Sequence, residues 1–349
     1  MAPGAREKCV MKIFVLHENA AWVEPLRKAL AERSLPFEEW FLDEGHVDLA
    51  SAPPAGVFYN RMSASSHTRG HRYAPEMTSL VLAWLEGHGR RVVNTSRALR
   101  LELSKVAQYE ALKACHIHTP RTVAAVGRRA TVEAAEAFAP GPILLKPNRG
   151  GTGHGVRLFQ TIGALRDHVL GDAFEAPIDG VSLVQEYVRA PEPYITRAEF
   201  IGGRFFYAVR VDTSDGFELC PADACQVNDG PKFTIADAID SALRGKYEAF
   251  LAANGIEIGG IEFITDETGR VFTYDVNTNT NYNADAEARA KRSGMGEIAR
   301  FLGDELARLA SPRDGALRLA GGPPPWRRDS PLVGPTGRTG PRPAPGMTV

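Results

Sequence analysis

The sequence predicts an α/β fold in two parts. A small N-terminal domain has a mostly parallel sheet, and a larger α+β region is built from antiparallel hairpins. Strand-like and helix-like segments alternate over residues 11–103, an order typical of parallel sheets. Two later segments each read as a strand, a short glycine-containing turn and a second strand. A third, glycine-rich turn joins a strand that ends in Lys146 to a strand that begins near Val156.

Residues 11–103 are expected to form a Rossmann-like domain that follows a flexible leader over residues 1–10. Apolar residues recur at strand and helix spacings along it. The predicted strands cover residues 12–16, 37–42, 56–59 and 91–93, and the predicted helices lie around residues 22–30 and 77–85.

Polar residues are frequent in the loops of this domain. They fit either an ordinary solvated surface, which is the commoner case, or contact with a small substrate. These residues are Asn60, Arg61, His67, Arg69 and His71.

A second unit is expected from Ser104, which can cap a helix that runs from Lys105 to about Cys115. The chain has only nine lysines, so a lysine at this position carries information. Lys105 is therefore a candidate functional residue, with a plain surface residue as the alternative.

A glycine-rich turn follows Lys146. Glycines let backbone N–H groups approach a phosphate closely, and the lysine adds a point charge. The turn is not a P-loop, because Val156 rather than a Lys-Ser or Lys-Thr pair follows its last glycine. It is not a dinucleotide fingerprint, because a strand and not a helix comes next. We therefore expect a phosphate clamp, with an ordinary hairpin as the alternative; its glycines are Gly150, Gly151, Gly153 and Gly155.

The first later hairpin turns at Gly202-Gly203. Counting outward pairs Glu199 with Phe206, and the alternation of side chains then places Arg197 and Arg210 on one charged face. Two arginines on one face suit a carboxylate or a phosphoryl group in transfer, unless the face is simply solvated.

The second hairpin turns over residues 266–269, and pairing Thr265 with Arg270 places Glu262, Asp275 and Asn277 on one face. Carboxylate and amide oxygens are ligands that Mg²⁺ prefers, so we expect a metal site here. The opposite face is expected to be apolar and to carry Ile261, Phe263, Phe272, Tyr274 and Val276.

The run after Asn277 is rich in asparagine, and Asn279 and Asn281 are expected to contact a small substrate beside the metal.

In series, these motifs resemble those of the ATP-grasp carboxylate–amine ligases. The resemblance is greatest to the ribosomal-protein glutamate ligase and lysine-biosynthesis branch, and it covers about residues 104–309. It implies ATP held between two antiparallel sheets, in lobes formed by residues 104–187 and 188–310. It further implies phosphate ligands at Lys105, Lys146 and the glycine turn, and a site for adenine at Gln185, Glu186 and Val188. Ile195 stands where the family usually has the acid that holds the ribose, so either Glu192 replaces that acid or the ribose is held otherwise. The resemblance also implies two Mg²⁺ ions, replaceable by Mn²⁺, at Glu262, Asp275 and Asn277.

The reaction that the resemblance implies is amide formation. A carboxylate attacks the γ-phosphate of ATP to give an acyl phosphate and ADP, and an amine then displaces phosphate. Arg210, with Arg197 second, is expected to steady the charge that develops. Residues 217–223 replace the family's usual acceptor loop, so neither glutamate nor any other substrate is assigned. An ATP-grasp kinase acting on a hydroxyl and a non-catalytic ATP-binding regulator are the alternatives.

Composition indicates a cytoplasmic enzyme without nucleic-acid or membrane partners. The formal net charge is −1, and no apolar run reaches the length of a bilayer span. Four cysteines are too few for a disulfide framework, and Cys220 and Cys225 lack zinc-site spacing. A homodimer or homotetramer is compatible with the sequence. Residues 311–349 contain nine prolines and seven glycines and are expected to form a disordered tail.

Overall fold

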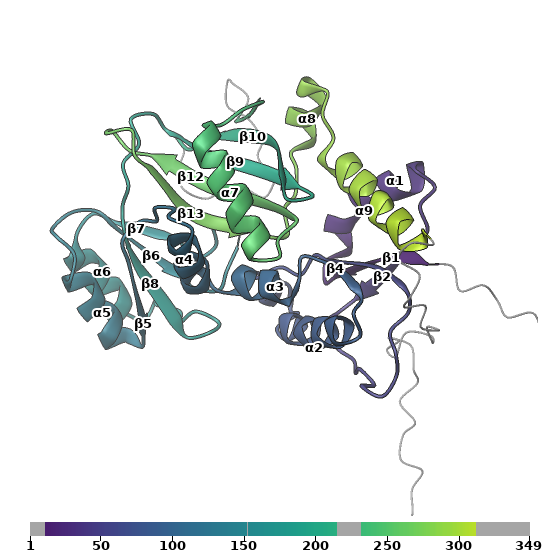
Figure 1. Ribbon diagram of the computed structural model, residues 1–349. Coiled ribbons are helices and arrows are strands. Elements are labelled where there is room, and N and C mark those ends of the chain that lie inside the picture. The colour runs from purple at the N-terminus through teal and green to yellow at the C-terminus, as the bar shows by residue number, and fades with distance from the viewer. Residues whose placement is uncertain (1–10, 152, 215–231, 312–349) are drawn as a thin grey trace, which may run out of the picture.

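A computed structural model of the protein describes residues 11–151, 153–214 and 232–311. The expected leader, the tail beyond residue 311, and Cys220 and Cys225 lie outside the described residues. The described strands form three sheets (Figure 1). Among the described helices, none combines the length and the apolar character that crossing a membrane requires.

The first sheet has the order β2-β1-β3-β4 with every neighbouring pair parallel, which confirms the expected N-terminal sheet. Its strands are apolar on both faces because helices cover both. Ile13 and Val15 face α1, whereas Phe14 and Leu16 face α2. The elements are β1 (Lys12–His17), α1 (Ala20–Glu32), β2 (Phe37–Phe41), β3 (Gly56–Asn60), η1 (Ser66–Arg69), α2 (Ala74–Gly87), β4 (Arg91–Val93) and α3 (Ser96–Leu103).

The last described helix, α9 (Gly294–Ala310), returns to this first sheet and packs beside α1, β1 and β3 (Figure 1). The sequence boundaries placed it in the C-terminal lobe. Its apolar stripe, which includes Ile298 and Leu302, predicts a buried helix but does not say which sheet it covers. The core around α9 also contains Ile195 and Val209, so the N-terminal unit and the third sheet share one core.

The second sheet has the order β5-β8-β6-β7 with every pair antiparallel, and α5 and α6 pack together against it (Figure 1). The β6–β7 hairpin carries the glycine-rich turn, as expected. The elements are β5 (Thr122–Val126), α5 (Arg128–Glu136), β6 (Ile143–Pro147), β7 (Arg157–Phe159), α6 (Ile162–Leu170) and β8 (Val181–Glu186).

Helix α4 (Lys105–Ala114) begins where the sequence predicts, because the Ser104 side chain accepts a hydrogen bond from the amide of Ala107. Its sequence position suggests the lobe of residues 104–187, but the helix packs against the third sheet. The Gln108 side chain donates to the Val276 carbonyl at 2.8 Å, and Tyr109 and Leu112 join the core of the third sheet.

The third sheet has the order β11-β10-β9-β12-β13 and is antiparallel throughout. Its strands supply most of the residues that the sequence singled out. The elements are β9 (Tyr194–Ile201), β10 (Arg204–Asp212), β11 (Phe233–Ala236), α7 (Ser241–Ala253), β12 (Ile258–Thr265), β13 (Val271–Asn277) and α8 (Ala284–Ala290).

The predicted register of the β9–β10 hairpin is wrong beyond its first pairs. A β-bulge at Phe206 pairs Glu199 with Tyr207 instead. A shift of one residue turns every following side chain to the other face of the strand. Arg210 therefore does not share a face with Arg197.

The β12–β13 hairpin contains two shifts that compensate each other. Thr265 pairs with Val271 rather than with Arg270, and a second shift next to Glu262 brings Glu262 directly opposite Asp275. The two carboxylates thus share a face, as expected, and lie closer along the sheet than the predicted register implies. At the second shift Tyr274 has no partner on β12. Its side chain lines the site pocket and does not belong to the apolar face, where it was expected.

Candidate functional site

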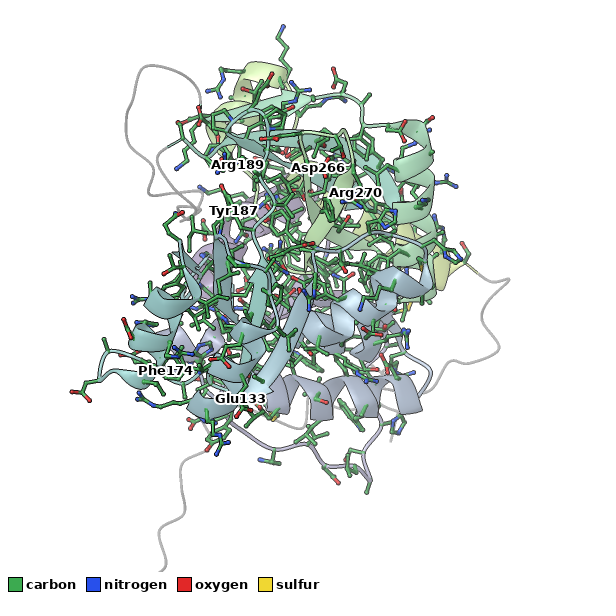
Figure 2. All side chains as sticks on the ribbon, turned by 90° about the vertical axis from the view of Figure 1, so that its left-hand side faces the viewer. Glu133, Phe174, Tyr187, Arg189, Asp266 and Arg270 are labelled. Carbon is green, nitrogen blue, oxygen red and sulfur yellow. The ribbon has the colours of Figure 1, made fainter. Side chains whose placement is uncertain are left out.

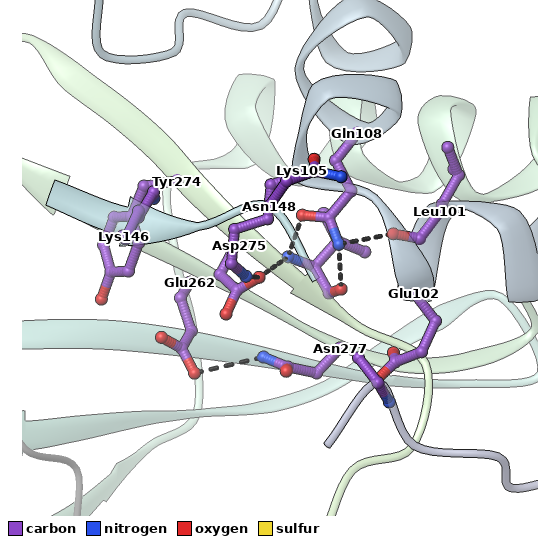
Figure 3. Close-up of polar contacts among 12 residues, drawn as sticks. Leu101, Glu102, Lys105, Gln108, Lys146, Asn148, Glu262, Tyr274, Asp275 and Asn277 are labelled. Atoms are coloured by element: carbon purple, nitrogen blue, oxygen red, sulfur yellow. Dashed lines mark hydrogen bonds and ion pairs between the residues drawn. The ribbon is translucent and has the colours of Figure 1, made fainter. Parts of the chain in front are cut away.

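Two lysines and two carboxylates from four elements line one pocket between the second and third sheets. Lys105 starts α4, Lys146 lies in β6, Glu262 in β12 and Asp275 in β13 (Figure 3). These positions span 171 residues of the chain, so only the fold brings the four side chains together. The pocket is the candidate active site.

Lys105 is paired with Asp275. Its Nζ lies 2.5 Å from Asp275 Oδ1, and the lysine is buried. Burial alone lowers the pKa of Lys105, but the Asp275 carboxylate and its hydrogen bond outweigh burial and raise it. Lys105 is thus a permanent cation at the floor of the pocket.

Lys146 has no carboxylate partner within ion-pair distance among the described residues and is only 5% exposed. Its Nζ donates to Tyr109 Oη at 2.6 Å and lies 5.3 Å from the centre of that ring. Burial, together with the charge of Lys105, lowers the pKa of Lys146 to about 7. A phosphate beside Lys146 would supply the missing counter-charge.

Glu262 is a buried acid whose pKa shifts in the opposite direction to that of Lys146. It is 4% exposed, and burial, followed by the nearby charge of Asp275, raises its pKa to about 7. Asn277 Nδ2 donates to Glu262 Oε1 at 3.2 Å (Figure 3). Glu262 is buried and Asp275 half-buried, and two carboxylates on one face are stabilised when a cation lies between them.

The donor set fits Mg²⁺. Glu262, Asp275 and Asn277 offer hard oxygen ligands, and Mg²⁺ commonly takes one or two carboxylates together with substrate phosphates. No group of three or more His, Cys, Asp or Glu residues suited to a metal occurs in the described part of the chain.

The glycine-rich turn adopts a backbone that requires glycine at two positions. Gly153 has φ 75° and Gly155 has φ 78°, which lie in the left-handed region. Gly150, Gly151 and Gly153 line the pocket. Gly155 faces a neighbouring cavity on the side of the N-terminal unit.

The pocket also has apolar lining residues, among them Leu144, Ile195 and Ile264. Gln185, Glu186 and Val188 line it at the end of β8, where the sequence places adenine. The Glu186 amide already donates to the Arg121 carbonyl at 2.9 Å, so this amide is not free to read a base.

Figure 2 shows the connection beyond β8, on which Tyr187 and Arg189 lie. In that view Tyr187 and Arg189 lie above the lobe that carries Glu133 and Phe174 and beside the turn that carries Asp266 and Arg270. Tyr187 and Val188 of this connection are among the residues that line the pocket.

No protein-family model matches the chain, and no curated protein matches its sequence. Solved structures do match. A RimK-domain ATP-grasp protein from Sphaerobacter thermophilus has 19% identity and a TM-score of 0.58, covering 83% of this chain and 98% of the other. The ATP-grasp ligase PsnB with its minimal precursor has 17% identity and a TM-score of 0.60, covering 84% and 98%. D-cycloserine synthetase DcsG has 18% identity and a TM-score of 0.58, covering 84% and 99%.

The chain has the ATP-grasp fold. The expected pair of antiparallel sheets, with a small α/β domain ahead of them, is confirmed. Identities below 20% establish the fold and leave the chemistry to be argued from the residues.

Arg210 and Glu192 are expected site residues that lie away from this ATP-grasp pocket. Arg210 is exposed and stacks on the ring of Tyr194 at 5.1 Å, on the face that the Phe206 bulge turns away from Glu262. Glu192 is exposed on the loop before β9 and is not part of the pocket wall. The bulge explains the error for Arg210, whereas Glu192 was inferred only as a replacement for an absent acid.

Arg197, unlike Arg210, lies on the same face of the sheet as Glu262. It lies opposite Glu262 on the neighbouring strand, and its Nε donates to Glu199 Oε1 at 2.5 Å. Its Nη2 donates to the Asn281 carbonyl at 2.6 Å. Arg197 is therefore the arginine beside the candidate metal ligands.

Three residues at or near the site were missed as site residues. Tyr109 lies four residues after Lys105, a helical spacing that places both on one face and could have predicted it. Tyr274 reaches the pocket through a bulge that no sequence signal marked. Arg61 belonged to the loops interpreted as solvated, yet it is 2% exposed and contacts Asn279 and Asn281.

Proposed function

We propose that the protein is an ATP-dependent carboxylate–amine ligase. The convergence of Lys105, Lys146, Glu262 and Asp275 on one pocket between two antiparallel sheets carries this proposal. The pocket combines apolar lining residues with four charged side chains, which suits the base and the triphosphate of ATP.

The chain's own residues perform binding and charge neutralisation rather than covalent catalysis. Lys105 and Lys146 hold the phosphates, and Gly150, Gly151 and Gly153 line the pocket beside them. The substrate carboxylate oxygen bonds to the γ-phosphorus as the bond to ADP breaks. The amine nitrogen then bonds to the acyl carbon, and phosphate leaves with the former carboxylate oxygen.

Glu262, Asp275 and Asn277 would hold Mg²⁺, and we propose two ions, for which Mn²⁺ substitutes. The metal supplies charge neutralisation on the nucleotide phosphates. Arg197, beside these ligands and one-quarter exposed, is the residue that we assign to the developing negative charge.

The substrates that we propose are a small acid and an amino compound or peptide. Related folds span this range, since PsnB is described in complex with a precursor peptide and DcsG is named a D-cycloserine synthetase.

Oxygen-isotope transfer tests the proposal. Acids and amines are screened for ADP release with Mg-ATP, products are weighed by mass spectrometry, and the active acid is then labelled with ¹⁸O in its carboxylate. A ligase transfers one ¹⁸O atom from the acid to inorganic phosphate for each amide formed. ADP release with a hydroxyl substrate and a phosphorylated product would establish a kinase instead. ATP binding without turnover on any pair would indicate a regulator.

A further inference from the structure

The loop 278–281, directly after β13, is held by buried polar residues of the N-terminal unit. Glu102, on α3, accepts hydrogen bonds at its Oε2 from the amide of Thr278 at 2.7 Å and from its hydroxyl at 3.1 Å. Its Oε1 accepts from the amide of Ala64 at 3.2 Å. Asn94 donates to the Thr278 carbonyl at 2.8 Å. One end of the loop is thus fixed to the first sheet.

Arg61 fixes the other end of the same loop. Its Nε donates to Asn279 Oδ1 at 3.1 Å, and its Nη2 donates to Asn281 Oδ1 at 2.8 Å and to the Thr280 carbonyl at 3.3 Å. In the described part of the chain no carboxylate lies within ion-pair distance of Arg61. The remaining nitrogen, Nη1, donates to Met295 Sδ at 3.7 Å. A buried guanidinium that directs three of its four hydrogen bonds to one loop is a strong geometric constraint on that loop.

The loop is also bound from the site side. Arg197 donates to the Asn281 carbonyl, and the Thr280 hydroxyl donates to Glu199 Oε2 at 2.9 Å. Asn281 therefore lies between the guanidinium groups of Arg61 and Arg197. The candidate metal ligand Asn277 is the residue immediately before the loop.

We propose that Arg61 and Glu102 are positioning residues: through the loop 278–281, the N-terminal unit sets the orientation of Asn277 and Arg197 in the active site. The side-chain oxygens of Asn279 and Asn281 accept hydrogen bonds from Arg61, so these asparagines hold the loop to the N-terminal unit instead of binding substrate through those oxygens. The inference rests on the proposed ligase function for its consequence in turnover, whereas the loop geometry is independent of it.

Hydrogen exchange and kinetics test this role together. Arg61→Lys removes the planar, multidentate donor, and Glu102→Gln replaces a carboxylate acceptor with an amide of the same shape. Arg91→Lys is the matched control, because Arg91 is a half-buried arginine of the same unit that bridges Glu257 and Glu305 and makes no contact with the loop.

The measurements are amide exchange over residues 277–283, the dissociation constant of Mg-AMPPNP by calorimetry, and steady-state kinetics. We expect loop amides to exchange at least about tenfold faster in Arg61→Lys and Glu102→Gln, which corresponds to the loss of about one charged hydrogen bond. We expect kcat/KM for the acid or the amine to fall by about tenfold or more, while Mg-AMPPNP affinity stays within about twofold. Arg91→Lys should leave loop exchange and kcat/KM as in the unmodified protein.

Unchanged loop exchange in both variants would overturn the positioning role. The same holds if Arg91→Lys lowers kcat/KM as much as they do, or if Mg-AMPPNP affinity falls in parallel with turnover. Failure of the ligase proposal is distinguishable, because the unmodified protein would then form no amide while the exchange measurement still decides whether Arg61 and Glu102 hold the loop.

Discussion

At the scale of single residues, Lys146 and Glu262 are two buried ionisable groups that suit a ligand with a negative and a positive charge. Burial lowers the pKa of Lys146 to about 7 and raises the pKa of Glu262 to about 7. Each group is therefore easily neutralised in the free protein. A nucleotide with its metal ion presents an anion to the lysine and a cation to the carboxylate, so both charged forms are stabilised at once.

Nucleotide binding at pH 8 should therefore be linked to a protonation at Lys146. Above pH 7 the free lysine is mostly neutral, and the triphosphate favours its charged form, so binding takes up a proton and affinity falls as pH rises from 7 to 9. Titration calorimetry of Mg-AMPPNP at pH 8, in buffers of different ionisation enthalpy, measures this uptake. Lys146→Met should lower the measured uptake, with Lys113→Met, on the exposed side of α4, as the control. The same uptake in Lys146→Met as in the unmodified protein would refute the assignment.

Several site residues could be predicted because their residue type and their immediate sequence neighbours were enough to single them out. Lys105 follows a capping serine, and Lys146 ends an apolar strand before glycines. Glu262 and Asp275 belong to a hairpin whose turn can be recognised in the sequence. Arg61 was not assigned a site role, because burial of a loop arginine depends on partners more than 200 residues away.

At the scale of elements, the start of α4 links the two lysines. Ser104 Oγ accepts from the Ala107 amide and donates to Asn148 Oδ1, which also accepts from the Val106 amide. Asn148 lies two residues after Lys146. The cap of the helix thus fixes the distance between the helix that carries Lys105 and the strand that carries Lys146.

Ser104→Ala should lower the free energy of unfolding by about 1 kcal/mol, the usual cost of an N-cap, and should also weaken nucleotide binding. Thr161→Ala removes the cap of α6, outside the pocket, and should cost similar stability without changing nucleotide affinity. Urea denaturation and Mg-AMPPNP titration compare the two variants. Equal nucleotide affinity in both would show that the cap of α4 does not position the site.

The two hairpins could be predicted from the sequence, but their registers could not. Glycine turns and alternating polarity predicted that β9–β10 and β12–β13 form hairpins. Bulges at Phe206 and Tyr274 then changed the faces, because an extra residue costs little locally and its benefit lies in packing that the sequence does not display. The bulges moved Arg210 out of the site and Tyr274 into it.

At the scale of the whole molecule, the ATP-grasp fold here consists of a large unit and a smaller lobe. The first and third sheets share a core through α9, whereas the second sheet has a core of its own with α5 and α6. The residues that line the pocket come from both of these units and from the connection between them.

Leucine truncations in the two cores should then act on separate unfolding transitions. Leu302 and Leu165 are both fully buried, the first in the shared core and the second in the lobe core. Each Leu→Ala change should cost about 3 kcal/mol. Calorimetry should show a different transition lowered in each variant, and a saturating nucleotide should bring the transitions together. A single transition that both variants lower equally would show that the units are not independent.

The arrangement of sheets could be predicted from motif order, but the assignment of α4 and α9 to sheets could not. Both helices have apolar faces that fit several neighbours, and the choice is made by contacts distant in sequence, such as Leu302 against the first sheet and Tyr109 against the third.

The most direct test of the shared nucleotide and metal site is a calorimetric titration of Mg-AMPPNP into the unmodified protein, Lys105→Met and Glu262→Gln. We predict binding of one nucleotide per chain to the unmodified protein and at least about a hundredfold weaker binding to each variant, with the melting temperature retained. No binding to the unmodified protein, or unchanged binding in both variants, would contradict a site built from these four elements.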